Sequence, residues 1–381
     1  YLLIGAFIVG AGLVINGIFS VSMLLEQYGI YFLLIFIIQA LSGMVTFYTR
    51  GIGHISDLSI TSVITSVVTI TLNIVFLLVF EWGLIGYFLA NILGPLAQCV
   101  YLIFRGRMLQ QTHWLKSYSV ESRLLILYSL PLIANSLAWW VNNSSDRYIV
   151  IFFCGIAANG IYSVASKIPS ILAVFQSIFS QAWTLSAVQD FDPEDSQGFF
   201  ANTYKGYNFL MTIICSLLIV LDKPLASFLY AKDFYTAWQY VPWLTIAILF
   251  GSMAGYIGGI FVAVKNSKIF ASSTLVGAAV NVVLNFLVVP IIGPLGAAIS
   301  TTLCYVIVWG IRLFQSRKYI KMRINLMRDI TSYIMLGIQA AGILFITETW
   351  ELTLFLIGTF ILVLTLYIPD MKIVINRIRY R

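Results

Sequence analysis

The stretch that decides the fold reads NSLAWWVNNSSDRYIV at residues 135–150 and continues through Cys154 to a second block that ends at Lys167. It holds three charged residues, Asp146, Arg147 and Lys167, between long apolar runs. A charged side chain at membrane depth costs at least about 2.5 kcal/mol, so it is kept where it faces a cavity or a partner. The stretch therefore predicts a polar cavity inside a bundle of membrane-spanning helices.

The composition of the whole chain supports this class. Of its 381 residues, 60% are hydrophobic and only 10% are charged, whereas a soluble domain has roughly 25% charged residues. The apolar blocks are about 20 residues long, which suits helices crossing a ~30 Å hydrocarbon core, and they lack the alternation of barrel strands. We expect an all-α polytopic membrane protein. The net charge of +7 belongs to short loops, and no nucleic-acid partner is expected.

About twelve membrane spans are predicted from the positions of these apolar blocks. Their approximate limits are 1–22, 29–48, 58–80, 84–104, 123–145 (running on to about 154), 158–187, 207–221, 240–262, 269–290, 295–314, 330–347 and 351–369. The connections between them are short, so a large domain outside the membrane is not expected.

The distribution of lysine and arginine orients these spans. With the loop at Arg50 placed in the cytoplasm, the outer side receives only Lys223 and Lys232 of the 22 basic residues. So strong a bias is typical of the positive-inside rule. The rule places the C-terminus in the cytoplasm together with the basic segment 312–328, which we expect to face anionic lipid head groups.

An internal repeat relates two pairs of spans. A polar turn, a span, a Gly-x-x-Gly turn, a second span and basic residues follow each other around Gly83 and Gly86, and again around Gly293 and Gly296. The offset of 210 residues contains an even number of spans. The repeat therefore predicts two helix bundles of parallel orientation, related by an axis along the membrane normal.

The repeat also divides the chain into domains. We expect an N-terminal lobe at residues 1–120, a C-terminal lobe at 121–316, and an extra helix pair with a basic tail at 317–381. The counterpart of the start of the second lobe falls upstream of residue 1. About two further helices are therefore expected before this sequence, which would give the intact protein about fourteen spans.

Polar residues on the span that begins at 123 share one helical face. Asn135, Trp139, Asn142 and Asp146 follow each other at helical spacing, and Arg147 lies on the adjoining face. Because Asp146 and Arg147 are neighbours in sequence they cannot face each other, so each is expected to have another partner.

The next span carries a second polar stripe, which includes Lys167 and Gln181. Two polar stripes on consecutive helices predict a hydrated cavity lined by both. Arg147 and Lys167 would attract a phosphate or diphosphate head group, and Asp146 is the candidate site for a proton or sodium ion. The alternative is that Asp146 and Arg147 are solvated at the outer interface while Lys167 snorkels to it.

Further polar residues lie within the other spans or at their ends. Gln39 either lines the cavity from the first lobe or bonds to a neighbouring helix. Arg50 is a candidate for the cytoplasmic gate, although the positive-inside rule alone explains it. Asn281 and Asn285, four residues apart on one face, are interpreted as making hydrogen bonds between helices.

No enzyme constellation is apparent. The two histidines, His54 and His113, have no matched cysteine or histidine partner, and the four cysteines lie in apolar segments. The acidic loop at 190–195 is interpreted as a solvated start of the next helix rather than a metal site. We therefore expect no catalytic residue, no metal and no cofactor.

The chain resembles a known family of transporters. Residues 135–150, then Gly155 and the block NGIYSVASKIP at 159–169, resemble the polysaccharide-transporter flippases of the multidrug/oligosaccharidyl-lipid/polysaccharide (MOP) superfamily. The sequences YTRG at 48–51 and GPLGA at 293–297 fit the same family. The resemblance covers nearly the whole chain and implies the MOP flippase fold, with the family's first two helices absent here.

The resemblance also implies a substrate and a location. These flippases move an oligosaccharide on undecaprenyl diphosphate, an O-antigen or capsule repeat unit of polysaccharide and lipopolysaccharide synthesis, between leaflets of the bacterial inner membrane. Alternating access of the two lobes, driven by H⁺ or Na⁺, would carry it outward. Membrane lipids and other polysaccharide-assembly proteins are the further partners implied.

Two other functions remain open at this stage. A multidrug or toxin cation antiporter of the same superfamily would favour acidic residues in the cavity of the first lobe, and none is buried in those spans. A polysaccharide polymerase or ligase would need a large outer loop with catalytic arginine or histidine, and the outer loop at 222–239 is short.

Overall fold

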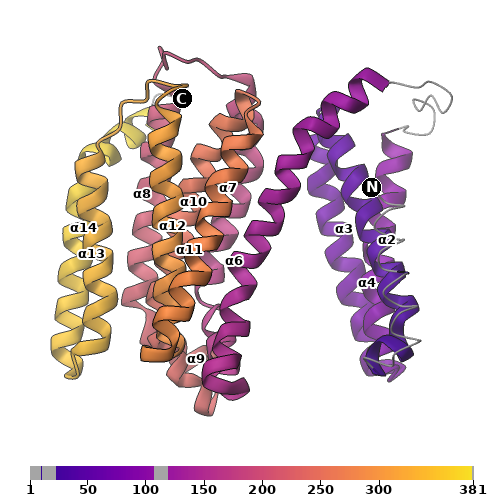
Figure 1. Cartoon of the computed structure of the whole chain (residues 1–381), viewed down its shortest axis with the longest axis horizontal. Coiled ribbons are helices and arrows are strands. Elements are labelled where there is room, and N and C mark those ends of the chain that lie inside the picture. The colour runs from indigo at the N-terminus through magenta and orange to yellow at the C-terminus, as the bar shows by residue number, and fades with distance from the viewer. Residues whose placement is uncertain (1–9, 11–22, 107–118, 380–381) are drawn as a thin grey trace. The chain divides into compact units, whose positions relative to one another are not determined.

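The computed structural model describes residues 10, 23–106 and 119–379. Helices and their connecting turns make up this part of the chain, and no strand occurs in it (Figure 1). The chain divides into two compact units, Tyr1–Ser117 and Tyr118–Arg381. The expectation of an all-helical protein is confirmed.

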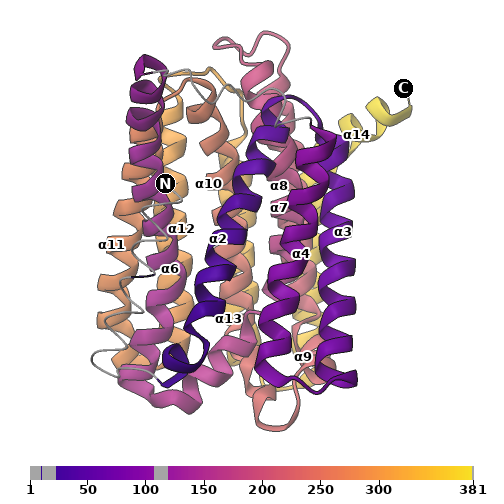
Figure 2. The ribbon, with the colours of Figure 1, turned by 90° about the vertical axis from the view of Figure 1, so that its right-hand side faces the viewer.

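The first unit is built around one helix. It contains α2 (Met23–Gly51), α3 (Ile55–Ile74) with a π-helical continuation η1 (Val75–Val79), and α4 (Gly83–Arg105). Helix α4 packs against both α2 and α3, and α3 and α4 lie side by side in Figures 1 and 2. Gln98 of α4 joins all three helices: it donates to Thr46 Oγ1 of α2 (3.0 Å) and accepts from Thr65 Oγ1 of α3 (3.0 Å).

The second unit is larger and contains the remaining helices. They are α6 (Ser119–Ala165), α7 (Pro169–Gln189), α8 (Phe199–Val220), α9 (Asp222–Leu229), the 3₁₀ helix η2 (Lys232–Gln239), α10 (Val241–Ala263), α11 (Ser267–Ile292), α12 (Pro294–Ser316), α13 (Leu326–Phe345) and α14 (Thr349–Arg379).

Helix α10 forms the centre of the second unit. Its apolar segment is 78% buried, against 28% for α11. It packs against α7, α8, α12 and α13, while α11 lies between α6 and α12. Side chains from α10 such as Leu249, Met253 and Ile257 are fully buried, and the indole of Trp183 on α7 donates to the Tyr256 carbonyl at 2.8 Å. This core fixes α7, α10 and α12 around the site described below.

The helix pair α13–α14 belongs to the same unit and is attached to α8 by buried polar contacts. Tyr333 of α13 donates to Asn208 Oδ1 at 2.7 Å, and Asn208 donates to the hydroxyl of Tyr367 on α14 at 3.2 Å. Ser216 of α8 donates to Gln339 Oε1 at 2.9 Å. Buried hydrogen bonds between helices are retained in apolar surroundings because an unpaired polar group there is costly.

The two Gly-x-x-Gly turns have the same construction. Gly83 and Gly293 have φ angles of 54° and 66°, which favour glycine. Gly86 and Gly296 lie where two helices approach closely: an added Cβ at Gly86 would be 2.7 Å from the Cβ of Phe76, and one at Gly296 would be 2.9 Å from the backbone of α11. The first glycine of each turn is required by the backbone and the second by packing.

Ten helices in the described residues are long and apolar enough to span a membrane. The predicted span 1–22 lies outside the described residues. The predicted span 330–347 is helical, as α13, but is not among the ten. A multi-pass membrane protein is therefore supported, with the other ten predicted spans each overlapping one of these helices.

The prediction of a single span at 158–187 is wrong. Gly155 interrupts α6 with φ 86° and ψ 171°, and α6 then ends at Ala165. Helix α7 begins at Pro169, which favours the first helical position because its missing N–H would have no partner there. Lys167 lies in the turn between the two helices, so the second polar stripe is divided between α6 and α7.

The acidic loop before α8 has the predicted role. The carboxylate of Asp195 accepts from the backbone N–H groups of Phe200 (3.0 Å) and Ala201 (2.9 Å) and so caps the first turn of α8. Asp192 accepts from the hydroxyl and N–H of Ser196, and these hydrogen bonds lower the pKa of that carboxyl. The loop therefore starts the next helix.

Candidate functional site

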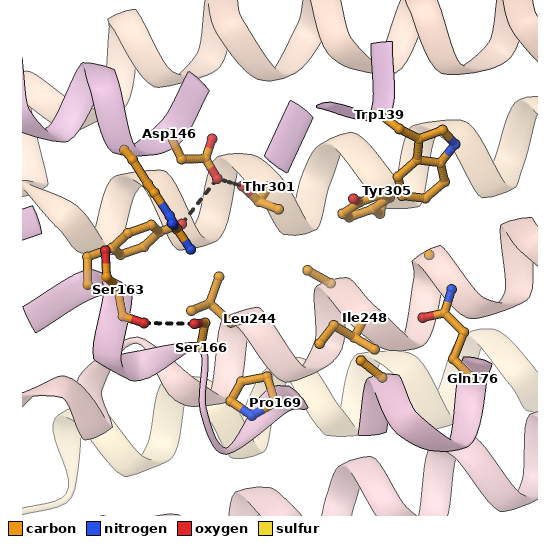
Figure 3. A pocket seen from close by; sticks show the side chains of 15 residues that line it. Trp139, Asp146, Ser163, Ser166, Pro169, Gln176, Leu244, Ile248, Thr301 and Tyr305 are labelled. Atoms are coloured by element: carbon orange, nitrogen blue, oxygen red, sulfur yellow. Dashed lines mark hydrogen bonds between the residues drawn. The ribbon is translucent and has the colours of Figure 1, made fainter. Parts of the chain in front are cut away.

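The carboxylate of Asp146 on α6 is buried and held by three neutral donors. It accepts hydrogen bonds from Thr301 Oγ1 on α12 (2.5 Å), Asn285 Nδ2 on α11 (2.7 Å) and the Tyr162 hydroxyl beyond the Gly155 break (3.1 Å). Only 4% of Asp146 is exposed. Figure 3 shows Asp146 and Thr301 joined across the site. We name Asp146, Tyr162, Asn281, Asn285 and Thr301 the carboxylate cluster.

Asn281 forms the second layer of the carboxylate cluster. It donates to Thr301 Oγ1 (3.2 Å), and its side-chain oxygen accepts from Ser145 (2.9 Å) and from Asn285 (3.1 Å). The interpretation of Asn281 and Asn285 as interhelical hydrogen-bonding residues is confirmed. They also do more than that, because both orient the donors around a buried acid.

One atom of the carboxylate cluster is left over. The side-chain oxygen of Asn285 is buried and has no hydrogen-bond partner among the described residues. A buried acceptor without a donor is costly, at about 1–3 kcal/mol. Together with the Asp146 carboxylate it makes the cluster rich in oxygen acceptors and poor in positive charge.

The carboxylate cluster opens onto a cavity of about 370 Å³. The residues that line it come from α6, α7, α10 and α12: Trp139, Asp146, Arg147, Tyr162, Ser163, Ser166, Pro169, Ala173, Gln176, Leu244, Ala247, Ile248, Gly251, Thr301 and Tyr305. The rings of Trp139 and Tyr305, with centroids 5.2 Å apart, lie at the end away from Asp146 in Figure 3. The cavity therefore has one acidic end and one aromatic end.

Arg147 lines this cavity but does not pair with Asp146. Its side chain is exposed, and no ion pair joins it to another residue in the described part of the chain. The two residues are neighbours in sequence and border the same cavity without forming an ion pair. A solvated guanidinium at the edge of the cavity is available to an anionic group.

Asn135 belongs to a different buried network. It accepts from Thr274 Oγ1 at 2.5 Å, and Thr274 in turn accepts from Arg312 Nη2 at 2.8 Å. Arg312 also donates to Ser273 Oγ (2.9 Å) and to the Ala254 carbonyl (2.8 Å). This network joins α6, α10, α11 and α12, and Asn135 does not line the cavity.

Arg312 corrects a prediction. The positive-inside rule placed it in a basic cytoplasmic segment, but it lies in α12 and is 0% exposed. Its guanidinium also stacks over the ring of Phe270 at 4.2 Å. Counting charges along the sequence cannot distinguish an arginine in a loop from a buried arginine near the end of a helix.

Two further predicted site residues, Lys167 and Gln181, do not line the cavity. Lys167 is exposed in the α6–α7 turn, and Gln181 is exposed on α7. In the first unit Gln39 is exposed on α2, and the Arg50 guanidinium lies 5.9 Å from the ring centroid of Phe47. The side chain of Asn142 lies outside the described residues.

Sequence reasoning missed two members of the carboxylate cluster, Tyr162 and Thr301. Tyr162 lies within the block that carries the family resemblance, and Thr301 follows the second Gly-x-x-Gly turn by five residues. The available signal for Thr301 was its place near Asn281 in the α11–α12 hairpin. That signal is weak, because threonine is common in membrane helices.

No family model matches this sequence, and no curated protein matches it. Solved structures of similar fold do exist. The lipid II flippase MurJ in an inward closed conformation has a TM-score of 0.65 at 16% identity, covering 100% of this chain and 83% of that one. An outward-facing multidrug resistance MATE family transporter of the MOP superfamily has a TM-score of 0.64 at 12% identity, covering 87% and 78%.

A third structure, the MATE transporter ClbM in complex with Rb⁺, has a TM-score of 0.58 at 17% identity and covers 83% of this chain and 78% of that one. A flippase and a multidrug resistance MATE transporter thus match this chain about equally well. At these identities the comparison establishes the architecture. The chain has the fold of the MOP transporters.

Proposed function

We propose that this chain is a flippase that moves an undecaprenyl-diphosphate-linked oligosaccharide, an O-antigen or capsule repeat unit, from the inner to the outer leaflet of a bacterial inner membrane. Ion-coupled alternating access of the lobes 1–120 and 121–316 would drive it, with the helix pair at 317–381 attached and the C-terminus in the cytoplasm. The coarser part of this proposal, a membrane transporter, is supported by the shared fold.

The observation that carries the proposal is the buried Asp146 carboxylate at one end of a cavity. It has three neutral donors and no cationic partner among the described residues. A buried charge without a counter-charge is expensive, so Asp146 is suited to bind and release a cation. A structural carboxylate would instead be expected beside an arginine or lysine.

Either coupling ion that the sequence predicts, Na⁺ or H⁺, can bind to oxygen atoms such as those of the carboxylate cluster. Na⁺ would take the Asp146 carboxylate together with amide and hydroxyl oxygens, and the unpartnered oxygen of Asn285 is an additional acceptor beside it. H⁺ would bind Asp146 alone. A solved transporter of this fold, ClbM, is described in complex with Rb⁺, which favours a metal cation.

The anionic head group of the substrate would be attracted by Arg147, whose exposed guanidinium borders the cavity. A cavity of about 370 Å³ is at the small end of ligand sites. It therefore suits a phosphate with its ion rather than an oligosaccharide. Lys167, Asn142, Gln181, Gln39 and Arg50 stay as predicted contacts.

A second candidate is a multidrug or toxin cation antiporter. The MATE transporters match the fold about as well as the flippase does. The carboxylate cluster also shares its cavity with Trp139 and Tyr305, and aromatic rings beside an acid are suited to organic cations.

The deciding experiment deletes the full-length gene from its host and measures lipid-linked repeat units in each leaflet. We expect accumulation on the cytoplasmic face and loss of surface polymer, restored by the wild-type gene but not by Arg147→Ala or Lys167→Ala. Normal repeat-unit transport with increased sensitivity to cationic drugs would establish the antiporter instead. Units that reach the outer leaflet but stay unpolymerised would point to an enzyme.

A further inference from the structure

The segment that joins α12 to α13 encloses a second cavity, separate from that of Asp146. Its volume is about 460 Å³. The lining residues are Leu313, Ser316, Arg317, Ile320, Lys321, Met322, Arg323, Ile324 and Leu326. None of them lines the cavity at the carboxylate cluster. We name this cavity the linker pocket.

The rim of the linker pocket is cationic. Arg317, Lys321 and Arg323 are exposed, and the sequence from 312 to 328 contains no acidic residue. Arg317 and Arg323 form no ion pair with any residue that the structure describes. Three cations from one short segment around a concave surface attract a phosphate more strongly than the same charges spread over a flat face.

The floor of the linker pocket is apolar. Leu313 and Ile320 are 6% and 3% exposed, and Ile324 and Leu326 complete the lining. A cationic rim above an apolar floor is complementary to an amphiphile that has a phosphate and a hydrocarbon part. A free phosphate ion would use the rim alone.

The linker pocket also lies at the right depth for such a molecule. Helix α12 is a candidate membrane span that ends at Ser316, and α13 begins at Leu326. A segment that directly follows the end of a membrane span lies in the head-group region of a bilayer. The basic residues predict that this is the cytoplasmic side, where anionic lipids attract lysine and arginine.

We propose that the linker pocket binds the phosphate of an anionic phospholipid, with Arg317, Lys321 and Arg323 as its ligands. This site is independent of the proposed transport function. It makes the α12–α13 segment a lipid-binding element of the second unit.

The Glu194 carboxylate competes with a bound phosphate for Lys321. Lys321 Nζ lies 2.8 Å from Glu194 of the loop between α7 and α8, and the Lys321 N–H donates to the Pro193 carbonyl at 3.0 Å. Both charged side chains of this ion pair are exposed, so the pair is weak. A bound phosphate would take over Lys321, so removing the Glu194 charge should strengthen lipid binding.

The test uses the purified full chain in detergent and counts bound lipids by native mass spectrometry. Phosphatidylglycerol is titrated against phosphatidylcholine of the same acyl chains. The pocket variant combines R317Q, K321Q and R323Q. The matched control removes three charges of the same predicted face outside the linker pocket, with K265Q, K268Q and K318Q.

We expect the pocket variant to lose about tenfold in phosphatidylglycerol affinity, the control variant to lose less than about twofold, and phosphatidylcholine binding to stay unchanged in both. Glu194→Gln, which keeps every cation, should raise phosphatidylglycerol affinity about two- to threefold. This variant tests the site even where the triple variant fails to fold.

Three outcomes would overturn the proposal. Equal loss in the pocket and control variants would mean diffuse surface charge. Complete displacement of phosphatidylglycerol by an equal concentration of inorganic phosphate would mean a small-anion site. Unchanged affinity in both the pocket variant and Glu194→Gln would remove the linker pocket from lipid binding altogether.

Discussion

The hairpins α3–α4 and α11–α12 share a turn but differ in what they bury. Both turn at a glycine with positive φ and pack at a second glycine three residues later. Midway along the first hairpin the polar contact is neutral, between Gln98 and Thr65, and its ion pair of Arg105 with Asp57 (3.6 Å) lies at the helix ends with the arginine exposed. The second hairpin surrounds Asp146 with Asn285 and contains the buried Arg312.

The surroundings of each hairpin explain this difference. Among the helices that the structure describes in the first unit, α3–α4 packs against α2, whereas α11–α12 packs against both α6 and α10. A buried charge needs donors or acceptors from several directions, and among the described residues the second hairpin has helices on more sides to supply them. The repeat therefore preserves the glycine turn in both hairpins, while buried charge occurs in the hairpin that packs against more helices.

The largest effect is expected from Asp146→Asn. It keeps the size of the side chain but removes the charge, so ion coupling should fail and transport should fall by about 100-fold, since losing a buried charged partner costs about 2–5 kcal/mol. Transport by reconstituted protein is measured across Na⁺ and pH gradients.

The matched control for Asp146→Asn is Gln98→Leu in the first hairpin, which removes a neutral contact and should leave ion dependence intact. If both variants lose transport equally with folding unaffected, the carboxylate cluster has no special role.

The second prediction concerns Arg312. Replacement by methionine removes a guanidinium that donates to Ser273, Thr274 and the Ala254 carbonyl, and it leaves those acceptors unpaired. The free energy of unfolding should fall by about 3 kcal/mol. Thermal unfolding in detergent measures this, with Arg317→Met as the exposed control. Equal stability of the two variants would show that the network contributes little.

The third prediction concerns the glycine turns that the two hairpins share. Gly83→Ala and Gly293→Ala each force a side chain into a left-handed conformation, so each should cost about 1–2 kcal/mol. Gly310→Ala, within α12 and with open space beside it, should instead stabilise by up to about 1 kcal/mol. A cost at only one of the two turns would mean that the repeat is not equivalent there.

The smallest effect is expected at Asp222, at the start of α9 outside the ten spans. It is 0% exposed, and neither carboxylate oxygen has a partner among the described residues. Burial raises its pKa well above the usual range, while the charge of Lys223 lowers it less. Because the folded-state pKa is the higher one, stability is fully present below the unfolded pKa near 4 and is lost as pH rises through the folded value.

At pH values above the folded-state pKa of Asp222, Asp222→Asn should therefore stabilise the protein by about 1 kcal/mol or more. At acidic pH it should change the stability little. Unfolding temperatures across a pH series measure it. A gain that is constant with pH would show that ionisation of Asp222 is not the cause. The contrast with Asp146, which has three donors, tests whether hydrogen bonds are what make a buried acid tolerable here.

The sequence was sufficient for the class of fold, and its limits are physical. Apolar blocks of helix length and the glycine repeat predicted spans and turns, because these depend on local composition. The single span at 158–187 failed because α6 ends at Ala165 and a new helix begins at Pro169, inside a run that is apolar on both sides. Hydropathy alone does not register such a break.

The site was predicted only in part, for a different reason. Asp146 and Arg147 were singled out because charge is rare in these segments, and the structure places both at one cavity. Thr301 and Tyr162 are ordinary residues whose role comes from meeting Asp146 in space. Asn135 shared the helical face of Asp146 but bonds to Thr274, because another helix covers that part of the face.

The partners of Asp146 also differ in when they are made. Tyr162 follows it by 16 residues, but Asn285 and Thr301 follow by 139 and 155. At synthesis rates of about 5–20 residues per second, α6 leaves the ribosome roughly 10–30 s before its last partner exists. During that interval the Tyr162 hydroxyl is the one donor of the three that is available to Asp146. The burial of Asp146 is therefore completed when α11 and α12 have been made. The order of the helices along the chain sets the time for which Asp146 lacks these two donors.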